Sequence, residues 1–433
     1  MARTYWVETL GCPKNQVDSD KLVGTLAADG MVPAASPEDA DLVVVNTCAF
    51  IEDARQESID TVLALSDARR RGAELVVTGC MAERYGHELA EALPEVDAVA
   101  GFGVPVTLGP TRRGDDTLVP SFDLLNLPRP AASAPWAYVK VAEGCDRACG
   151  FCAIPSFRGP QRSRSVDSIL AEVDQLGVAE VVLVAQDLAS FGRDQGVGER
   201  AIVPLVDAVA ARVERVRLLY LYPSDLTDAL VDAICRTGVP YFDLSLQHVS
   251  RLLMRRMRRW GDGQRFLDRI ADIRRREPDA AFRSNFIVGY PGETEDDHDQ
   301  LLAFVEEAQL DWCGFFAYSN EEGTYAAGLD GHVPAGLVAE RLAELTELQD
   351  AITARRRADL VDAEVEVLVD RPGQGRSHRE APEIDGIITV PDHLEVGTFH
   401  RLRVVDSLGP DLVAASDPTM PVAASRSVLG LEP

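Results

Sequence analysis

The chain has 433 residues and a formal net charge of -27. A chain of this length is expected to fold as two or three domains rather than around a single core. Its acidity argues against nucleic acid as the main partner, because phosphate binding depends on Lys and Arg, and it favours a basic partner. No apolar run approaches the length of a membrane span and no signal-like segment precedes the first expected strand, so we expect a cytoplasmic protein without a membrane partner.

Three cysteines in the first hundred residues each follow an apolar segment that is expected to be a strand. The segments are TYWVETL, DLVVVNT and ELVVTG, and the cysteines are Cys12, Cys48 and Cys80. Strands that alternate with helices predict a parallel sheet, in which the loops after the strand carboxyl ends share one edge. Three thiols at equivalent positions indicate a three-thiolate metal site, and the alternative is one or two structural cysteines.

Changes in sequence pattern divide the chain. We expect an N-terminal α/β domain over residues 1–103 and a linker over 104–134, where prolines accumulate and the periodicity is lost. Strand and helix patterns then alternate again over 135–361, with six expected strands: AYVKVAEG, EVVLVAQD, VRLLYLYP, YFDLSLQH, FRSNFIVGYPG and DWCGFFAYS. This pattern predicts a six-stranded partial (β/α) barrel, in which the chemistry gathers at the carboxyl ends of the strands.

The first of these six strands runs into a loop with three cysteines at CxxxCxxC spacing, Cys145, Cys149 and Cys152. A structural zinc site needs four N/S ligands and typically a second CxxC pair, which does not follow here. Thiolates suit iron-sulfur clusters, and a cubane held by only three of them keeps one iron free to bind something else. Three incidental cysteines are the alternative.

Other polar side chains are expected at the same end of the barrel. Gln186 and Asp187 follow the second strand, Gln247 ends the fourth, and Arg283 lies on the fifth. Each of them alone would be an ordinary solvated residue, and only their shared edge favours a function. The arginine-rich segment 251–260 could meet phosphates or an acidic electron donor, but it is explained more simply as a solvated helix face.

The last part of the chain, residues 362–433, shows short alternating strands broken by Gly and Pro turns. This pattern predicts a small antiparallel OB-like β-barrel. Barrels of this kind often bind RNA, and an RNA-binding barrel should be basic. This segment carries 13 acidic and 6 basic residues, so it would suit a positively charged protein segment instead.

Taken together, the chain resembles the radical S-adenosylmethionine (SAM) methylthiotransferases, from the N-terminal three-cysteine domain through the radical SAM barrel to a C-terminal TRAM domain. Within that family it resembles the branch that acts on an aspartate of small-subunit ribosomal protein twelve. The segments that carry the resemblance are LGCPKNQVDSD, EGCDRACGFCAIPSFRGPQRSRS, LQHVS, FIVGYPGET, YSNEEGTYA and REAPEIDG.

The resemblance implies two 4Fe-4S clusters. One would be held by Cys145, Cys149 and Cys152 and would bind SAM, and the other, on Cys12, Cys48 and Cys80, would hold the sulfur to be transferred. It also implies SAM contacts from Phe151, Gln186, Asp187, Gln247 and Arg283. Many superfamily members have Gly-Gly-Glu after the second strand, where this sequence has Ala185-Gln186-Asp187. Of the expected contacts, the one to the SAM amine is therefore the least defined.

The implied reaction places a methylthio group on the β-carbon of the target aspartate. The implied partners are the ribosomal protein, free or on the ribosome, a low-potential electron donor such as flavodoxin or ferredoxin, and a sulfur donor. Breaking an unactivated C–H bond requires a radical from a cofactor, while the protein supplies position and excludes water.

Three other functions share some of these features. A tRNA-adenosine methylthiotransferase would share all six cysteines and differ in the charge and local motifs of the C-terminal barrel. A non-enzymatic iron-sulfur carrier would not need a full barrel with polar strand ends. An RNA-binding protein with structural zinc would contain no iron.

Overall fold

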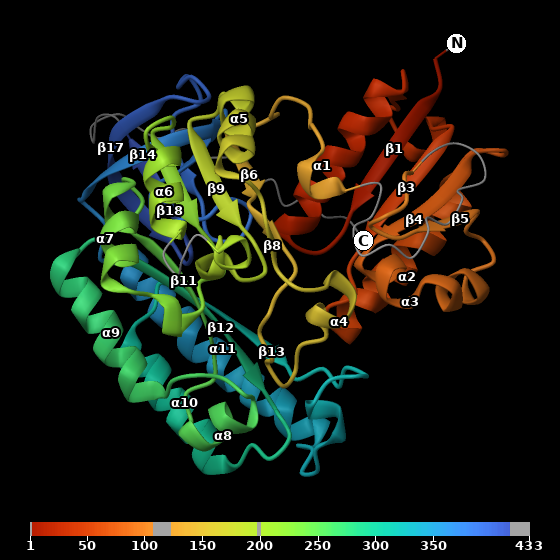
Figure 1. Cartoon of the computed structure of the whole chain (residues 1–433). Helices are drawn as coiled ribbons and strands as arrows, with labels where there is room; N and C mark the ends of the chain where they lie inside the picture. Colours follow the sequence, from red (N-terminus) through yellow and green to blue (C-terminus); the bar gives the residue numbers. More distant parts are fainter. Residues whose placement is uncertain (1, 107–122, 197–200, 416–433) are drawn as a thin grey trace.

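The computed structural model describes residues 2–106, 123–196 and 201–415. Figure 1 shows the N-terminal part, in red and orange, on one side of a central set of yellow, green and teal strands, with the blue C-terminal strands on the other side. Within these residues no helix combines the length and the apolar character needed to cross a lipid bilayer.

The N-terminal part is a five-stranded parallel sheet with strand order β2-β1-β3-β4-β5. Its strands are β1 Thr4–Thr9, β2 Val32–Pro33, β3 Leu42–Thr47, β4 Glu74–Gly79 and β5 Ala98–Ala100, and its helices are α1 Pro13–Ala28, α2 Glu52–Ala68, α3 Cys80–Ala92 and the 3-10 turn η1 Pro37–Asp39. The three expected strands are confirmed as β1, β3 and β4. The two edge strands are too short to give a pattern in the sequence.

The central strand β3 shows why this sequence forms a sheet that is covered on both faces. All six of its residues are buried. Val43 and Val45 pack into the core on one face, whereas Leu42 and Val44 pack into a separate core on the other. A run of β-branched residues without polar alternation is typical of a parallel strand that is buried on both sides.

The central part contains the six expected strands, which are confirmed as β6 Trp136–Lys140, β9 Glu180–Val184, β10 Arg215–Leu218, β11 Tyr241–Gln247, β12 Ala281–Val288 and β13 Trp312–Ala317. They form two parallel three-stranded sheets, β10-β9-β6 and β11-β12-β13. One parallel pairing, between Leu221 and Leu244, links the two sheets. The six strands therefore form one partial barrel.

Helices cover the outside of this barrel (Figure 1). The helices are α4 Ile154–Arg158, α5 Val166–Leu176, α6 Ile202–Ala210, α7 Asp228–Arg236, α8 Arg251–Arg256, α9 Gly263–Arg276, α10 Glu295–Ala308 and α11 Ala335–Ala358. Smaller elements are β7 Ala142–Glu143, β8 Arg162–Ser163 and the 3-10 turns η2 Leu124–Asn126, η3 Leu188–Ser190, η4 Arg193–Gln195, η5 Pro223–Asp225 and η6 Ala326–Gly328.

The described end of the proline-rich segment is anchored rather than extended into solvent. Leu124 and Leu125 of η2 are buried. The ammonium group of Lys21 on α1 donates a hydrogen bond to the carbonyl of Leu125 (2.6 Å). This segment therefore packs against α1 where the N-terminal sheet meets the barrel.

The C-terminal part is a closed five-stranded barrel with the order β14-β15-β16-β18-β17. Its strands are β14 Glu364–Arg371, β15 Gln374–Arg376, β16 Ile388–Thr389, β17 Phe399–Leu408 and β18 Asp411–Ala415. The small barrel is confirmed, but the expectation that it is purely antiparallel is wrong, because β16 and β18 run parallel. An odd number of strands cannot alternate in direction around a closed ring, so at least one pair must be parallel.

The loop between β15 and β16 packs into the end of the central barrel where the strands begin. Ala381 of this loop is buried in the same interior cluster as Val17 of α1. The hydroxyl of Tyr138 donates to the carbonyl of Pro382 (2.9 Å), and the indole of Trp312 donates to that of Arg379 (2.7 Å). The REAPEIDG segment therefore lies largely inside the molecule.

Candidate functional site

Three of the six candidate cysteines follow a glycine with a left-handed backbone. The pairs are Gly11-Cys12, Gly79-Cys80 and Gly144-Cys145, and the glycine φ angles are +92°, +89° and +76°. A Cβ atom on Gly79 would lie 2.2 Å from the side-chain oxygen of Asn46, and one on Gly144 would lie 2.2 Å from the carbonyl of Pro160. Only glycine fits these turns, which direct each thiol out of the end of its strand.

The first three cysteines come together at the carboxyl edge of the N-terminal sheet, and we call them the auxiliary triad: Cys12, Cys48 and Cys80. Cys12 caps α1, Cys48 follows β3, and Cys80 is the first residue of α3. Burial raises the pKa of the Cys48 thiol to about 12, and the neighbouring charges of Cys80 and Cys12 add to this effect. The three thiols are thus electrostatic neighbours, as the parallel topology predicts.

Asn15, in the first turn of α1, connects the loops of the auxiliary triad. Its side-chain amide donates to the carbonyls of Leu10 (2.9 Å) and Thr47 (3.1 Å), which precede Cys12 and Cys48. Its side-chain oxygen accepts a hydrogen bond from Arg158 (2.9 Å). Asn15 is fully buried. One amide side chain therefore holds the neighbouring loops in register.

Helix α4 connects the auxiliary triad to the cysteine loop of the barrel. It begins just after Cys152 and packs against α3. At its end, the Arg158 guanidinium donates to the Cys80 sulfur (2.9 Å) and to both carboxylate oxygens of Glu143 (2.9 and 3.0 Å). Because Glu143 stands two residues before Cys145, Arg158 joins the two cysteine sites through a single side chain.

The charges around Arg158 are buried and balanced. Lys140 lies against Asp18 (2.7 Å) and also pairs with Glu143. Although burial opposes it, the positive charges of Arg158 and Lys140 hold the pKa of Glu143 far below its usual range. Burial also opposes ionisation of Cys12, but the charges of Lys14 and Arg158 outweigh it and lower the pKa of that thiol. These cations therefore favour the thiolate form of Cys12, whereas burial still raises the pKa of Cys80.

The second set, which we call the radical triad, is Cys145, Cys149 and Cys152, all on one loop and all partly exposed. Burial raises the pKa of Cys145 to about 11 and that of Cys152 to about 12. The guanidinium of Arg259 donates to the Cys149 sulfur (3.2 Å). Each triad therefore has one sulfur that accepts a hydrogen bond from an arginine.

The residues next to the radical triad form a charged cluster. Arg147, inside the cysteine loop, donates to the carboxylate of Asp187 (2.5 Å) and pairs with Asp225. The guanidinium groups of Arg147 and Arg259 both lie against the ring of Tyr222, at 3.9 and 4.3 Å from its centroid. Asp187, at the end of β9, is thereby held beside the cysteine loop.

The expected SAM contacts lie at different depths. Gln186 donates to Glu143 (2.8 Å), and both Gln186 and Asp187 are beside the radical triad. Gln247 ends β11 with a φ angle of +72°, where the pairing with β12 shifts register. Arg283 lies inside the barrel and pairs with Asp243 (3.5 Å) and Asp385 (3.3 Å). Phe151 is partly buried against the barrel core.

Two observations bear on whether these residues fit a cluster and SAM. Among the described residues, Gln186 Oε1 and Asp187 Oδ1 are buried acceptors without a hydrogen-bond partner, as a site for a ligand with ammonium and hydroxyl donors requires. In the same part of the chain, no three His, Cys, Asp or Glu side chains converge closely enough for one metal ion. A cubane attaches each thiolate to a different iron, so its ligands need not converge on one point. The residues present therefore fit both an iron-sulfur cluster and SAM.

Sequence reasoning missed several buried residues of this site, among them Asn15, Lys140, Glu143 and Arg158. Asn15 and Arg158 lie in the CPKN and SFRGP segments that carry the resemblance, which was the available signal. Lys140 and Glu143 flank the end of a strand, a position that gives no indication of burial. The arginine-rich helix is also shorter than expected, since α8 ends at Arg256 and leaves Arg259 free to reach Cys149.

Family models match the three parts of the chain. The uncharacterized protein family UPF0004 matches residues 4–101, the radical SAM superfamily matches residues 139–305, and the TRAM domain matches residues 361–416. Among solved structures, the radical SAM methyltransferase TsrM from Kitasatospora setae aligns with a TM-score of 0.47 and 14% identity, over 73% of this chain and 75% of that one.

Relatives match over nearly the whole length. The ribosomal protein uS12 methylthiotransferase RimO of Kineococcus radiotolerans is 41% identical over 95% of this chain and 97% of its own. RimO of Saccharopolyspora erythraea is 43% identical over 95% of each chain. Matches over 95% of the chain include all three parts of the fold. The chain therefore belongs to the RimO family of radical SAM methylthiotransferases.

Proposed function

We propose that this protein transfers a methylthio group to the β-carbon of an aspartate in ribosomal protein uS12. This is the small-subunit ribosomal protein twelve that the resemblance implies as the substrate. The relatives that are 41% and 43% identical are named for action on uS12. The observation that carries the proposal is the link between the two cysteine sites through one buried side chain. Arg158 hydrogen-bonds Cys80 of one triad and Glu143 beside the other.

Each triad is proposed to hold one 4Fe-4S cluster. The ligands would be Cys12, Cys48 and Cys80 at the auxiliary triad and Cys145, Cys149 and Cys152 at the radical triad. When bound, the clusters and SAM would supply the radical chemistry that an unactivated C–H bond requires, together with the sulfur to be transferred. Three thiolates per site leave one iron of each cubane open for a non-protein ligand.

The protein side chains would bind and orient SAM beside the radical triad. The unpartnered oxygens of Gln186 and Asp187 would accept hydrogen bonds from its ammonium and hydroxyl groups. Arg147 fixes the Asp187 carboxylate and leaves one of its oxygens free. Phe151 and Gln247 would complete the site from the cysteine loop and the end of β11. Arg283 would act from within the barrel through Asp243.

The chain also positions the two sites relative to each other. Asn15, Arg158 and Glu143 form a buried chain of hydrogen bonds from the auxiliary triad to the start of the radical loop. Buried charges of this kind are strongly coupled because water does not screen them. A fixed separation of the two sites is what a transfer between them needs.

The test is anaerobic incubation of the iron-loaded protein with SAM, dithionite and purified uS12, followed by intact-mass and peptide analysis. We expect uS12 to gain the mass of one methylthio group in place of one hydrogen, located on an aspartate. Bulk tRNA serves as the competing substrate. A methylthioadenosine in tRNA with unmodified uS12 would overturn the proposal and support the tRNA-modifying alternative. An iron-sulfur carrier would cleave no SAM.

The remaining proposed partners are a low-potential electron donor such as flavodoxin or ferredoxin and a donor of sulfur. Replacing dithionite by flavodoxin, and adding or omitting sulfide, tests them in the same assay. Free uS12 and whole small subunits, compared at equal concentration, show which form of the protein is modified.

A further inference from the structure

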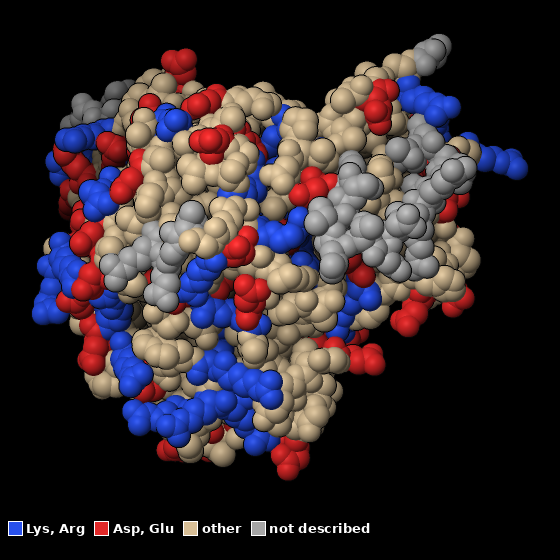
Figure 2. All heavy atoms as spheres, viewed as in Figure 1, with Lys and Arg blue, Asp and Glu red and all other residues tan. Residues whose placement is uncertain are grey.

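The segment 251–260 is strongly basic in a strongly acidic chain. It carries five arginines and no acidic residue, whereas the whole chain has a net charge of -27. We call these side chains the α8 arginine surface: Arg251, Arg255, Arg256, Arg258 and Arg259. Figure 2 shows Lys and Arg side chains gathered at the lower edge of this face, where α8 lies in Figure 1.

Two members of this surface are exposed and have no carboxylate partner among the described residues, Arg255 and Arg258. Arginine in the last turn of a helix complements the helix dipole, which accounts for Arg255. Arg258 lies beyond the helix with a φ angle of +55°, and its guanidinium stacks on Tyr325 at 3.6 Å. The dipole therefore does not account for Arg258.

The surface lies directly outside the radical triad. Arg259 donates to the Cys149 sulfur (3.2 Å), and the backbone N–H of Gly150 donates to the carbonyl of Met257 (2.8 Å). Figure 1 shows α8 well separated from the N-terminal sheet that carries the auxiliary triad. The α8 arginine surface is therefore a basic surface beside the radical triad and away from the auxiliary triad.

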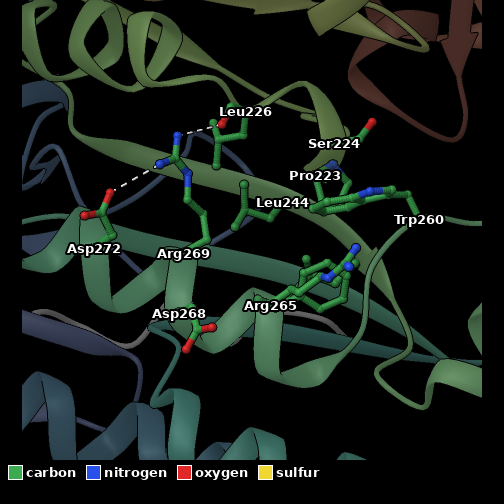
Figure 3. Close-up of a pocket in the computed structure, with 11 residues that line it drawn as sticks. Pro223, Ser224, Leu226, Leu244, Trp260, Arg265, Asp268, Arg269 and Asp272 are labelled. Carbon is green, nitrogen blue, oxygen red and sulfur yellow. Dashed lines mark hydrogen bonds and ion pairs between the residues drawn. The ribbon is translucent and has the colours of Figure 1, made fainter.

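An open pocket of about 420 Å³ adjoins this surface. Figure 3 shows the ring of Trp260 beside Pro223 at its edge, with Arg269 turned to Asp272 and to the carbonyl of Leu226 (3.2 and 2.6 Å). Because that arginine is paired internally, the pocket presents mainly apolar lining. Trp260 is 43% exposed and Leu252 is 74% exposed.

We propose that the α8 arginine surface, together with Trp260 and this pocket, is the docking site for an acidic one-electron carrier protein. The proposal rests on the proposed function, which requires a reduced metal site at the radical triad. One electron leaves the reduced carrier, which is oxidised by one electron, and enters that site, and no covalent bond forms or breaks. Arginine and exposed aromatic residues are the side chains enriched at protein interfaces.

The same arginines could contact the phosphates of RNA, but the apolar pocket beside them favours a protein. Carrier complexes are small and transient, and charge complementarity sets their rate of formation. The acidic remainder of the protein repels an acidic carrier and the basic patch attracts it, so the carrier is directed to this surface.

The test compares SAM cleavage driven by flavodoxin with SAM cleavage driven by dithionite in the iron-loaded, full-length protein. The variant is Arg255→Glu/Arg258→Glu. The matched control, Arg71→Glu/Arg401→Glu, makes the same change in charge at exposed positions outside the α8 arginine surface and its pocket. We expect the variant to lose about tenfold in kcat/KM for flavodoxin at low ionic strength, and added salt to bring the wild type towards the variant.

Dithionite is a small molecule that needs no docking site, so the dithionite-driven rate is expected to be equal in wild type, variant and control. Equal flavodoxin kinetics in variant and control would overturn the proposal. So would a loss with both reductants, because it would mean that the substitutions disturb the metal site itself. Unchanged flavodoxin kinetics with weakened binding to ribosomes would assign the surface to RNA. Wild-type cleavage under dithionite, measured first, reports separately on the proposed function.

Discussion

The two cysteine triads are built in different ways. The radical triad lies on one loop of eight residues, from Cys145 to Cys152, and stays partly exposed. The auxiliary triad draws one cysteine from each of three loops, and two of its members, Cys48 and Cys80, are buried. The first site is a local property of the chain, whereas the second exists only when the sheet has formed.

The arginines at the two triads also differ in how deeply they are buried. Arg158 has a 3% exposed side chain and is held by Glu143 and Asn15. Arg259 is partly exposed and belongs to a basic surface. A buried charge depends on its partners, because removing one partner leaves the other unpaired in a medium that solvates it poorly. The auxiliary triad should therefore be the more sensitive of the two to distant substitutions.

The largest expected effect separates the triads by reaction. We expect Cys149→Ala to abolish both SAM cleavage and methylthiolation, because it removes a ligand of the site that is proposed to bind SAM. Cys48→Ala is expected to abolish methylthiolation and retain SAM cleavage. Chromatography of the cleaved nucleoside and mass analysis of uS12 measure the two outcomes. Methylthiolation by the Cys48→Ala protein would refute the assignment of the auxiliary triad.

The second-largest expected effect is on stability, and it differs between substitutions of Arg158 and Arg259. Arg158→Met removes one of the two buried cations that Glu143 and Asp18 share, leaving only Lys140, and we expect it to lower the free energy of unfolding by about 3 to 5 kcal/mol. Arg259→Met removes the hydrogen bonds to the Cys149 sulfur and the Ser245 carbonyl at a partly exposed site, and we expect a loss of about 1 to 2 kcal/mol. Urea denaturation of both variants tests the difference. Equal losses would mean that the burial of Arg158 does not set its contribution.

A smaller effect is expected at Asn15. Asn15→Ala leaves the buried carbonyls of Leu10 and Thr47 without their donor, which should cost about 2 to 3 kcal/mol. The neighbouring Gln16→Ala is the control, since Gln16 is exposed and its side chain bonds only Asp20 among the residues that the structure describes, and its expected effect is within about 0.5 kcal/mol. Iron content after reconstitution should fall in the first variant alone. Full iron loading of Asn15→Ala would argue against its role in holding the loops.

The last prediction concerns Glu143, whose contribution to the pH dependence of stability is small near neutral pH. Its pKa lies well below the ordinary 4.5, because Arg158 and Lys140 outweigh the opposing effect of burial. Stabilisation from a lowered carboxyl pKa is fully present above 4.5 and is lost as the pH falls towards the folded-state pKa. Thermal unfolding midpoints should therefore stay flat between about pH 5 and 8 and fall below that range. Glu143→Gln should give a lower midpoint with a weaker acid dependence, and an unchanged profile would exclude this carboxyl as the cause.

Much of the fold follows from local patterns. Runs such as LVVVNT predict buried parallel strands because they lack polar alternation, and β1, β3, β4 and the six barrel strands appear where expected. The convergence of Cys12, Cys48 and Cys80 follows from topology alone, since parallel strands end at a common edge. The two-residue strand β2 and the three-residue strand β5 could not be predicted, because two or three residues are too few to show a hydrophobic periodicity.

Charge counting over the C-terminal segment was less informative, because sequence does not show which charges face inward. Glu380 pairs with Arg357, and Asp385 pairs with Arg283 (3.3 Å), and both acids are buried. These residues neutralise arginines of the central barrel instead of contributing to an acidic surface. The acidic character of the EAPEIDG segment, which carries part of the resemblance, has the same explanation, because this segment closes the interior of the barrel.

The amino-acid sequence by itself determined the elements, the order of the three parts and the radical triad, because each depends on residues that are close along the chain. Only the tertiary structure decided which partners the buried charges take. Arg158 is 78 residues from Cys80 in sequence and lies 2.9 Å from its sulfur. No local pattern specifies such a contact, because it forms only when α4 packs on α3 and burial makes an unpaired charge too costly.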